Sequence, residues 1–444
     1  MFNLTVSEAA LLLAISEPRV YQLIKQGSLE VEKVGSIWLI SKESVDARLA
    51  KRPGVGRPPK QRDSGRALQT YTLLNRDHMV LDFKYNATTG EFFETENLYD
   101  TARAPLGLVS PRGARVSARA LAFWWRHRAI PLNRQGMEQK LAKLGVAEPY
   151  QLPFTSFGLS LSDQYWIRPF ESLVTWKEIN YFDNDFGELH FDGDWLGEVG
   201  HNSPDNTSEG VLPKKWICEG DRRLLLKGGS ALNQEPYNEV VATALFTRLL
   251  EKDNYVVYTL RQLKGDAVSI CENFVSSEEE YIPAYYVRQV LRQANHHSDY
   301  QHYLECCVRL GIRNTEEALA KMIVCDNILG NTDRHWRNFG LIRNIETLKC
   351  RVAPLFDTGS SLWAHATEAQ LRAGDMSFTT KPFYEDPKRQ LRLVHDFSWL
   401  DPSALDGFVN EAIQVLVGNP ALKERIVYVG AAIQERIDRI VASL

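Results

Sequence analysis

Hydrophobic and polar positions in the first 50 residues follow the 3.6-residue period of helices and then the two-residue period of strands. Apolar residues between positions 9 and 13 come after Thr5 and Ser7, either of which can cap a helix. A second amphipathic run begins near Glu17 and stops at Gly27, and glycine commonly terminates helices. The pattern therefore predicts two short helices joined by a tight turn.

The period changes after residue 28. Residues 29–34 and 36–40 alternate between apolar and polar side chains around Gly35, which predicts a two-stranded hairpin. Ser41 then opens a third amphipathic run that is typical of a helix. Helix, turn, helix, hairpin and helix is the order of elements in a winged helix-turn-helix.

The stretch from Lys51 to Arg66 has a different composition from its surroundings. It holds six cations and one anion, is rich in proline and glycine, and offers little to bury. Such a segment is typical of an exposed linker, so we place a domain boundary near residue 52 and the next start near residue 68. The string G-R-P-P-K around Arg57 is similar to the core of an AT-hook, and a plain basic linker is the alternative.

The helical part of the N-terminal module carries a resemblance. Residues 5–29, T-V-S-E-A-A-L-L-L-A-I-S-E-P-R-V-Y-Q-L-I-K-Q-G-S-L, resemble the DNA-binding modules of excisionases and MerR-type regulators. The resemblance implies that the second helix enters the major groove of double-stranded DNA. Arg19 and Gln22 would then contact base edges, and Lys25 would contact phosphate. A module for protein contact is the alternative.

Overall composition narrows the remaining classes. The chain has 444 residues and a net charge of −4, which argues against a protein that coats nucleic acid over its whole surface. No apolar run approaches the roughly 18 residues of a membrane span, and the first residues lack a secretory pattern, so we expect a cytoplasmic protein. The six cysteines contain no C-x-x-C pair and are expected to be reduced thiols.

The strongest chemical signal lies in residues 327–340, N-I-L-G-N-T-D-R-H-W-R-N-F-G, followed by A-P-L-F-D-T-G at 353–359. Asp333 and Asn338 stand five positions apart in a loop that follows an apolar helix. Two predicted strands come next, and the second of them delivers Asp357. This order brings two carboxylates and an amide to one loop region.

Those side chains suit phosphoryl transfer. One carboxylate must accept a hydroxyl proton, and an asparagine oxygen and a second carboxylate must hold magnesium. Protein kinases use the same D-x-x-x-x-N spacing, with the metal aspartate on a later strand. We assign Asp333 as the base, and Asn338 and Asp357 as magnesium ligands, with loop capping as the alternative role.

A nucleotide side is predicted upstream. The apolar strand ending at Lys227 carries a lysine that needs an anion, and ATP phosphate is a fitting one. Glu239, in the helix that begins near residue 235, could orient that lysine. The small, hydroxyl-rich loop before the strand, with Gly210 and Lys214, could cover phosphates, although it matches no Walker A or kinase glycine motif.

Together these motifs resemble the HipA family of serine/threonine toxin kinases, whose fold is phosphoinositide-kinase-like. The resemblance covers roughly residues 70–444 and is clearest in N-T-D-R-H-W-R-N-F-G and A-P-L-F-D-T-G-S-S-L. It implies that the backbone around Glu272 and Phe274 binds adenine. It also implies autophosphorylation of the phosphate loop, at Thr207 or the adjacent Ser208, which ejects the loop and inactivates the kinase.

We therefore expect an α+β chain in which a winged helix-turn-helix leads to a bilobal kinase with a mostly helical C-terminal lobe. The expected parts are residues 1–52 (DNA-binding module), 53–68 (linker), 69–274 (N-terminal lobe) and 275–444 (C-terminal lobe). Expected ligands and partners are ATP, magnesium, duplex DNA, a protein substrate such as a translation component, and an antitoxin. The alternatives are a regulator whose kinase fold senses a nucleotide without transfer, and a small-molecule kinase.

Overall fold

The chain divides into two compact units, Met1–Ser64 and Gly65–Leu444. The computed structural model describes residues 2–13, 15, 17–34, 37–50, 68–109, 115–132, 134, 141–142, 146, 148–170, 172–186, 203–208, 210–263 and 265–444. The predicted linker 53–68, with Arg57, lies outside these residues except for Leu68.

The first unit has the predicted order of elements. Its helices are α1 (Val6–Leu13), α2 (Glu17–Lys25) and α3 (Lys42–Ala50), and its strands are β1 (Phe2–Leu4), β2 (Val31–Val34) and β3 (Ile37–Ser41). The strands form one antiparallel sheet in the order β1-β3-β2, so a short N-terminal strand that the sequence did not predict extends the hairpin. Small and aliphatic side chains from all three helices and from β3 share one core, which includes Ala9, Val20, Leu23, Ile40 and Val45.

The second unit begins with an antiparallel sheet in the order β6-β5-β4-β7. Its strands are β4 (Leu68–Asn75), β5 (His78–Asn86), β6 (Glu91–Leu98) and β7 (Tyr165–Pro169). Helix α4 (Ala118–Arg126) packs beside β6 and buries Trp124 and Trp125. Short turns of helix follow at η2 (Pro149–Gln151), α6 (Leu152–Thr155), α7 (Trp176–Ile179) and η3 (Pro204–Thr207).

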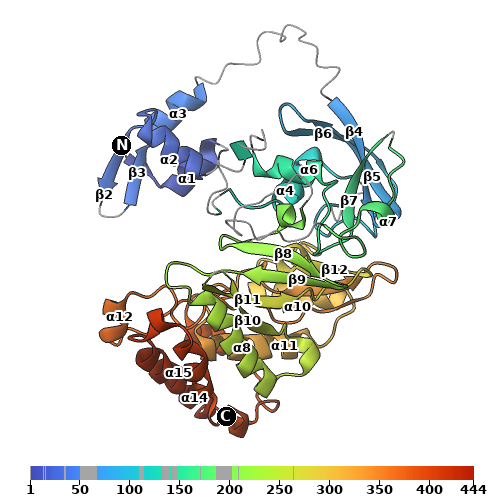
Figure 1. The fold of residues 1–444 in the computed structure, drawn as a ribbon. Helices are drawn as coiled ribbons and strands as arrows, with labels where there is room; N and C mark the ends of the chain where they lie inside the picture. The colour runs from blue at the N-terminus through green and yellow to red at the C-terminus, as the bar shows by residue number, and fades with distance from the viewer. Residues whose placement is uncertain are drawn as a thin grey trace. The chain divides into compact units, whose positions relative to one another are not determined.

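A second antiparallel sheet has the order β10-β11-β9-β8. It consists of β8 (Lys214–Glu219), β9 (Arg222–Lys227), β10 (Tyr258–Leu263) and β11 (Asp266–Glu272). The long helix α8 (Glu235–Leu249) packs against β10 and β11, with η4 (Lys252–Asn254) after it (Figure 1). The register pairs Lys227 with Lys214 on β8 and with Ser269 on β11, so the last residue of β9 lies inside the sheet.

The C-terminal part is mostly helical around a small sheet. Strands β12 (Glu279–Pro283), β13 (Gly340–Asn344) and β14 (Cys350–Val352) pair in that order. The helices are α9 (Ala284–Val287), α10 (Asp299–Arg309), α11 (Thr315–Leu329), α12 (Glu368–Arg372), α13 (Pro387–Leu391), η5 (Pro402–Leu405), α14 (Phe408–Val417), η6 (Pro420–Leu422) and α15 (Ile426–Val441). The predicted α+β class with a helical C-terminal part is confirmed.

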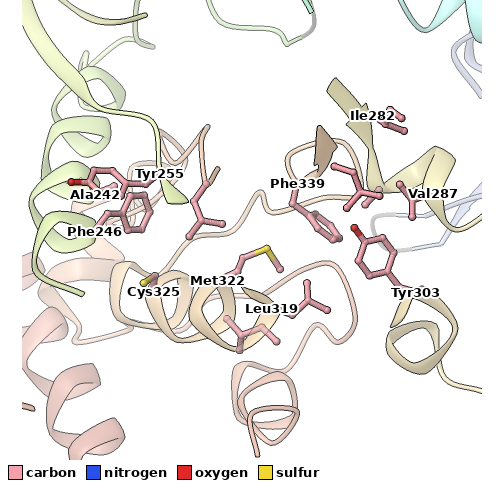
Figure 2. Packing of buried hydrophobic residues seen from close by; sticks show 14 of the residues in the cluster. Ala242, Phe246, Tyr255, Ile282, Val287, Tyr303, Leu319, Met322, Cys325 and Phe339 are labelled. Atoms are coloured by element: carbon pink, nitrogen blue, oxygen red, sulfur yellow. The ribbon is translucent and has the colours of Figure 1, made fainter. Parts of the chain in front are cut away.

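Helix α11 lies at the centre of the main core. Its Leu319, Met322 and Cys325 are buried, and Figure 2 shows them between Phe246 of α8 and Phe339, the residue before β13. Its first turn exposes Glu316 and Glu317, whereas residues 322–329 are all buried, so the second half of the helix is covered on every side. This burial fixes the position of the loop that follows α11.

Candidate active site

Lys227 lies between two carboxylates at the end of β9. Its ammonium group contacts Oε1 of Glu239, from α8, and Oδ1 of Asp357, from the segment after β14. The side chain of Lys227 is 6% exposed and that of Glu239 is 1% exposed. A lysine this deeply buried needs such anionic partners, because an unpaired charge in the interior is strongly disfavoured.

The second oxygen of Glu239 binds the chain next to Asp357. It accepts hydrogen bonds from the backbone nitrogen of Thr358 at 2.9 Å and from its hydroxyl at 2.7 Å. Asp357 itself has a φ of +57°, a left-handed conformation that costs energy for a residue other than glycine. The contacts on both sides of Asp357 hold the backbone in this conformation and aim the carboxylate.

Attraction between the lysines and the carboxylates of this cluster sets their protonation states. Burial disfavours the charged form of Lys227, but Asp357 and Glu239 outweigh that effect, so its pKa is raised. Burial also disfavours the charged form of Asp357, yet Lys214 and Lys227 hold its pKa well below the usual range. At neutral pH the lysine and the aspartate are therefore both charged.

The segment 355–361, which contains Asp357, is hydrogen-bonded to α8 and to the residues between α8 and β10. Leu355 exchanges backbone bonds with Asn254 at 2.8 Å and with Val256 at 2.9 Å. The side-chain amide of Asn238, in α8, donates to the carbonyls of Gly359 at 2.7 Å and Ser361 at 2.8 Å. The chain that carries the second candidate metal ligand is thus fixed to α8 at several points.

The loop after α11 is built on a buried ion pair. Gly330 ends the helix with a φ of +61°, and a side chain there would approach Trp363. Arg334 is fully buried and binds Asp326 through two hydrogen bonds of 2.8 and 3.0 Å. Its remaining nitrogen donates to the carbonyls of Asn338 at 2.7 Å and Phe356 at 2.5 Å. One guanidinium therefore joins the loop to the residue before Asp357.

Asp333 and Asn338 lie at the two ends of this loop. The amide nitrogen of Asn338 donates to the carbonyl of Asp333 at 2.9 Å, which leaves its Oδ1 as the atom that could hold a cation. The backbone nitrogen of Asp333 donates to Oδ1 of Asn331 at 3.0 Å. The Asp333 carboxylate is 41% exposed, with Nζ of Lys381 at 3.0 Å.

A cavity brings most of the predicted residues together. Lys214, Lys227, Asn338 and Asp357 line it, with residues 271–275 and Phe356 on its apolar side. Glu272 and Phe274 belong to that wall, and the Glu272 side chain points to an exposed ion pair with Arg222 at 3.4 Å. Asp333, Glu239 and Gly210 are not part of the lining. One part of the cavity is aromatic, with the ring centroids of Phe274 and Phe356 5.0 Å apart, and another part is charged, with Lys214, Lys227 and Asp357.

The predicted phosphate loop is folded inward. Thr207 and Ser208 are buried and line the cavity. The Thr207 hydroxyl donates to the carbonyls of Leu159 at 3.0 Å and Pro204 at 3.2 Å. Gly210 has a φ of +97°, and a Cβ at this position would lie 2.5 Å from Nζ of Lys214. The backbone conformation favours glycine here, whereas the end of the Lys214 side chain is flexible and could move aside.

Arg134 holds this loop, and sequence reasoning missed it. Its guanidinium donates to the hydroxyl of Ser208 at 3.0 Å, to the Ser208 carbonyl at 2.8 Å, and to the Gly210 carbonyl at 2.8 and 3.0 Å. Burial lowers the pKa of Arg134 to about 10. The sequence around Arg134 gives no local signal of this role, because its partners lie more than 70 positions away in the chain.

The predicted DNA-contacting residues lie on one helix of the first unit. Arg19, Gln22 and Lys25 are exposed on α2, while Val20 and Leu23 of the same helix are buried. The Arg19 guanidinium donates to Oε1 of Gln22 at 2.7 Å. The outward face of α2 therefore carries polar side chains that can donate and accept hydrogen bonds.

Two protein families match separate parts of the chain. Residues 4–53 match the helix-turn-helix domain family, and residues 215–415 match the HipA-like C-terminal domain family. The predicted resemblance is confirmed, and the cavity, the Asp326–Arg334 pair and the loop from Asp333 to Asn338 all involve this domain. No helix in the described part of the chain has the length and apolar character to cross a membrane.

Individual relatives match over limited ranges. The serine/threonine-protein kinase CtkA of Helicobacter pylori is 43% identical over 47 residues, which is 11% of this chain and 14% of that protein. The crystal structure of the H. pylori proinflammatory kinase CtkA superposes with a TM-score of 0.39 and 16% identity, covering 52% of this chain and 95% of that one. A chain of the Shewanella oneidensis HipA, HipB and operator DNA complex superposes with a TM-score of 0.46 and 14% identity. The match covers 83% of this chain and 97% of that one.

Proposed function

We propose that the protein is an ATP- and magnesium-dependent serine/threonine protein kinase of the HipA toxin type, with its own DNA-binding module. The observation that carries the proposal is the shared cavity of Lys227, Asn338 and Asp357. Asp333 lies at the other end of the loop that delivers Asn338. A cation, a metal-ligand pair and a carboxylate are the parts that phosphoryl transfer needs in one place.

The oxygen atoms present fit magnesium. Magnesium prefers carboxylate and carbonyl oxygens, and in phosphotransferases it is held by one or two side chains together with substrate phosphates. Asn338 and Asp357 supply such oxygens, whereas within the described ranges no three His, Cys, Asp or Glu side chains cluster as a metal site. When bound, magnesium would neutralise charge on the transferred phosphate.

The roles of the side chains follow from their positions. Lys227 would bind ATP phosphate, and Glu239 would hold Lys227 in place from α8. The apolar wall at residues 271–275 would receive adenine, with backbone at Glu272 and Phe274 as hydrogen-bonding groups. Gly210 and Lys214 would cover the phosphates. Asp333 would accept the proton of the attacking hydroxyl, since its exposed carboxylate can be reached by a protein substrate.

The direct test is incubation of the full chain with radiolabelled ATP and magnesium, with and without bacterial lysate, followed by mass spectrometry of phosphosites. Labelled protein in the presence of magnesium supports the kinase. ATP binding without transfer to the chain itself or to any lysate protein would favour the regulator instead. Transfer only to small metabolites would favour the small-molecule kinase.

Autophosphorylation of the phosphate loop forms part of the proposal. A phosphate on Thr207 or Ser208 adds about −1.5 to −2 charges next to the site of the ATP phosphates, so it should expel the loop and lower ATP affinity. Replacing both residues by alanine should give a kinase that binds ATP and does not inactivate itself. We expect a phosphosite at one of the two positions in the wild type and none in Asp333→Asn. Its absence from both proteins would refute self-regulation.

DNA binding by the first unit is a separate prediction. The full chain should shift promoter-proximal duplex DNA, and affinity should fall steeply with salt because the linker cations, Arg57 among them, displace counterions. Arg19→Ala should cost about 1–3 kcal/mol at the preferred site and relax base preference there. Arg48→Ala, which removes an exposed arginine of α3, serves as the control. No shift at low salt would indicate a protein-contact module.

The remaining partners are proposed from the family match and from what the solved structures contain. A HipB-like antitoxin would be the partner if the chain acts as HipA does in a HipA, HipB and operator DNA complex. The proposed substrate is a cytoplasmic protein, with a translation component as the first candidate. Affinity purification of the Asp333→Asn variant with magnesium and ATP would retain such a substrate.

A further inference from the structure

Lys381 lies beside the proposed base, on a segment that the catalytic motifs do not include. Its ammonium nitrogen is 3.0 Å from Oδ1 of Asp333, although the two residues are 48 positions apart. Exposed ion pairs of this kind contribute little to stability, typically below about 1 kcal/mol. The ion pair with Asp333 therefore adds little to the stability of the fold.

The segment that carries Lys381 is fixed by a buried side chain. Gln390 of α13 is 2% exposed, and its amide nitrogen donates to the carbonyl of Lys381. Its amide oxygen accepts from the backbone nitrogens of Phe383 at 3.1 Å and Tyr384 at 3.0 Å. A buried amide whose hydrogen bonds all go to one turn holds that turn in a single conformation.

Aromatic packing ties the same turn to the catalytic loop. The Phe383 ring meets the Trp336 ring edge-on at 5.4 Å, and Trp336 lies between Asp333 and Asn338 in the sequence. The ring of Tyr300, in α10, also packs edge-on against the Phe383 ring, with a centroid distance of 5.1 Å. Lys381 is thus presented to Asp333 by a turn that packs on the loop containing Asp333.

The geometry limits how far Lys381 can lie from the reacting atoms. A hydroxyl that gives its proton to Asp333 must come within about 2.6–3.2 Å of the carboxylate. Nζ of Lys381 lies 3.0 Å from Oδ1 of Asp333, so a hydroxyl that gives its proton to this same oxygen lies within about 6 Å of the ammonium nitrogen. The phosphorus that this oxygen attacks is then within reach of the flexible lysine side chain.

We propose that Lys381 is a catalytic residue that contacts the transferred phosphoryl group, an inference that rests on the proposed kinase function. In the step, the substrate hydroxyl oxygen bonds to the γ-phosphorus as the bond between that phosphorus and the β,γ-bridging oxygen breaks. The hydroxyl proton passes to Asp333, and ADP leaves with the bonding electrons. Lys381 stabilises the negative charge on the phosphoryl oxygens, as a positioned cation does in other phosphotransferases.

The test compares Lys381→Met and Lys381→Arg in the full chain, with Lys388→Met as the matched control. Lys388 is an exposed lysine of α13, and its side chain forms no hydrogen bond or ion pair within the described ranges. We expect Lys381→Met to lower the transfer rate at saturating ATP by about 10–100-fold, less than for a fully buried donor because the site is half-exposed. Lys381→Arg should recover at least half of the rate, and Lys388→Met should match the wild type.

A binding measurement separates phosphoryl contact from a structural role. ADP with magnesium and fluoride forms a planar mimic of the transferred phosphoryl group, and its dissociation constant is measured beside that of ADP. Lys381→Met should weaken the fluoride complex at least 10-fold and change ADP binding less than 3-fold. Gln390→Leu, which releases the turn and keeps the lysine, should weaken the same complex.

The outcomes distinguish the two proposals. If the wild type transfers phosphate and Lys381→Met keeps its rate and its affinity for the fluoride complex, the lysine proposal is wrong and the kinase stands. If ADP and fluoride-complex affinities fall equally, Lys381 has a structural role only, and the proposal is again wrong. If the wild type neither transfers phosphate nor binds nucleotide, the kinase function fails and the lysine proposal fails with it.

Discussion

Replacing Asp333 by asparagine should abolish phosphoryl transfer and leave the fold intact. The Asp333 side chain is 41% exposed and contacts Lys381 and, at 4.0 Å, His335, so an isosteric amide disturbs little packing. The amide cannot accept the proton of the attacking hydroxyl, and losing a positioned base costs about 10²–10⁴-fold in rate. The measurement is the single-turnover rate with labelled ATP and magnesium.

Asp266→Asn provides the matched control for this experiment. Asp266 is an exposed aspartate at the start of β11, outside the cavity lining. The Asp266→Asn variant should transfer phosphate at the wild-type rate. Asp266→Asn and Asp333→Asn should both unfold at the wild-type temperature. Wild-type transfer by Asp333→Asn would show that another group accepts the proton.

Replacing Arg334 by leucine should destabilise the Gly65–Leu444 unit by about 3–5 kcal/mol. The change leaves the Asp326 carboxylate buried without its cation and removes donors from the carbonyls of Asn338 and Phe356. Breaking a buried ion pair from one side carries a cost of this size. Urea unfolding followed by tryptophan fluorescence measures it, since the tryptophans of this unit include buried Trp125 and Trp166.

Two further variants test the cause of that loss. Arg313→Leu removes an exposed arginine between α10 and α11 and should change stability by less than about 0.5 kcal/mol. Combining Arg334→Leu with Asp326→Leu removes the stranded carboxylate, so the double variant should be more stable than Arg334→Leu alone. A single variant within 1 kcal/mol of the wild type would contradict the role assigned to this pair.

The sequence predicted those features whose signals are local. Hydrophobic periodicity and capping residues placed α2, α3, the β2–β3 hairpin and α11 close to their observed positions. The spacing of Asp333 and Asn338 indicated one loop, and the following strands indicated that Asp357 returns to it. The contact between Lys227 and Glu239 could be predicted for the same reason, because the end of a strand and the next helix are close in the sequence.

The missed residues depend on contacts between distant segments. Arg134 reaches Ser208 and Gly210, and Lys381 reaches Asp333, only because the chain folds back on itself. Neither arginine nor lysine in a polar stretch carries a pattern that distinguishes a structural cation from a solvated one. Strand β1 was missed because three residues are too few to show alternation. The roles of the site residues stay predictions until activity is measured.

The bonds between α8 and residues 355–361 bear on how a nucleotide would exchange. In a kinase whose two lobes separate freely, ADP leaves as the cleft widens, and the metal aspartate moves away from the lysine. Here Asp357 is held beside Lys227 by the bonds of Leu355, Thr358, Gly359 and Ser361 to α8 and to the chain that follows it. Arg334 also bonds the preceding residue, Phe356, to the loop after α11. We therefore expect ADP to leave past the loop that Arg134 holds, since Ser208 of that loop lines the cavity. The residence time of ADP should therefore depend on how often that loop detaches.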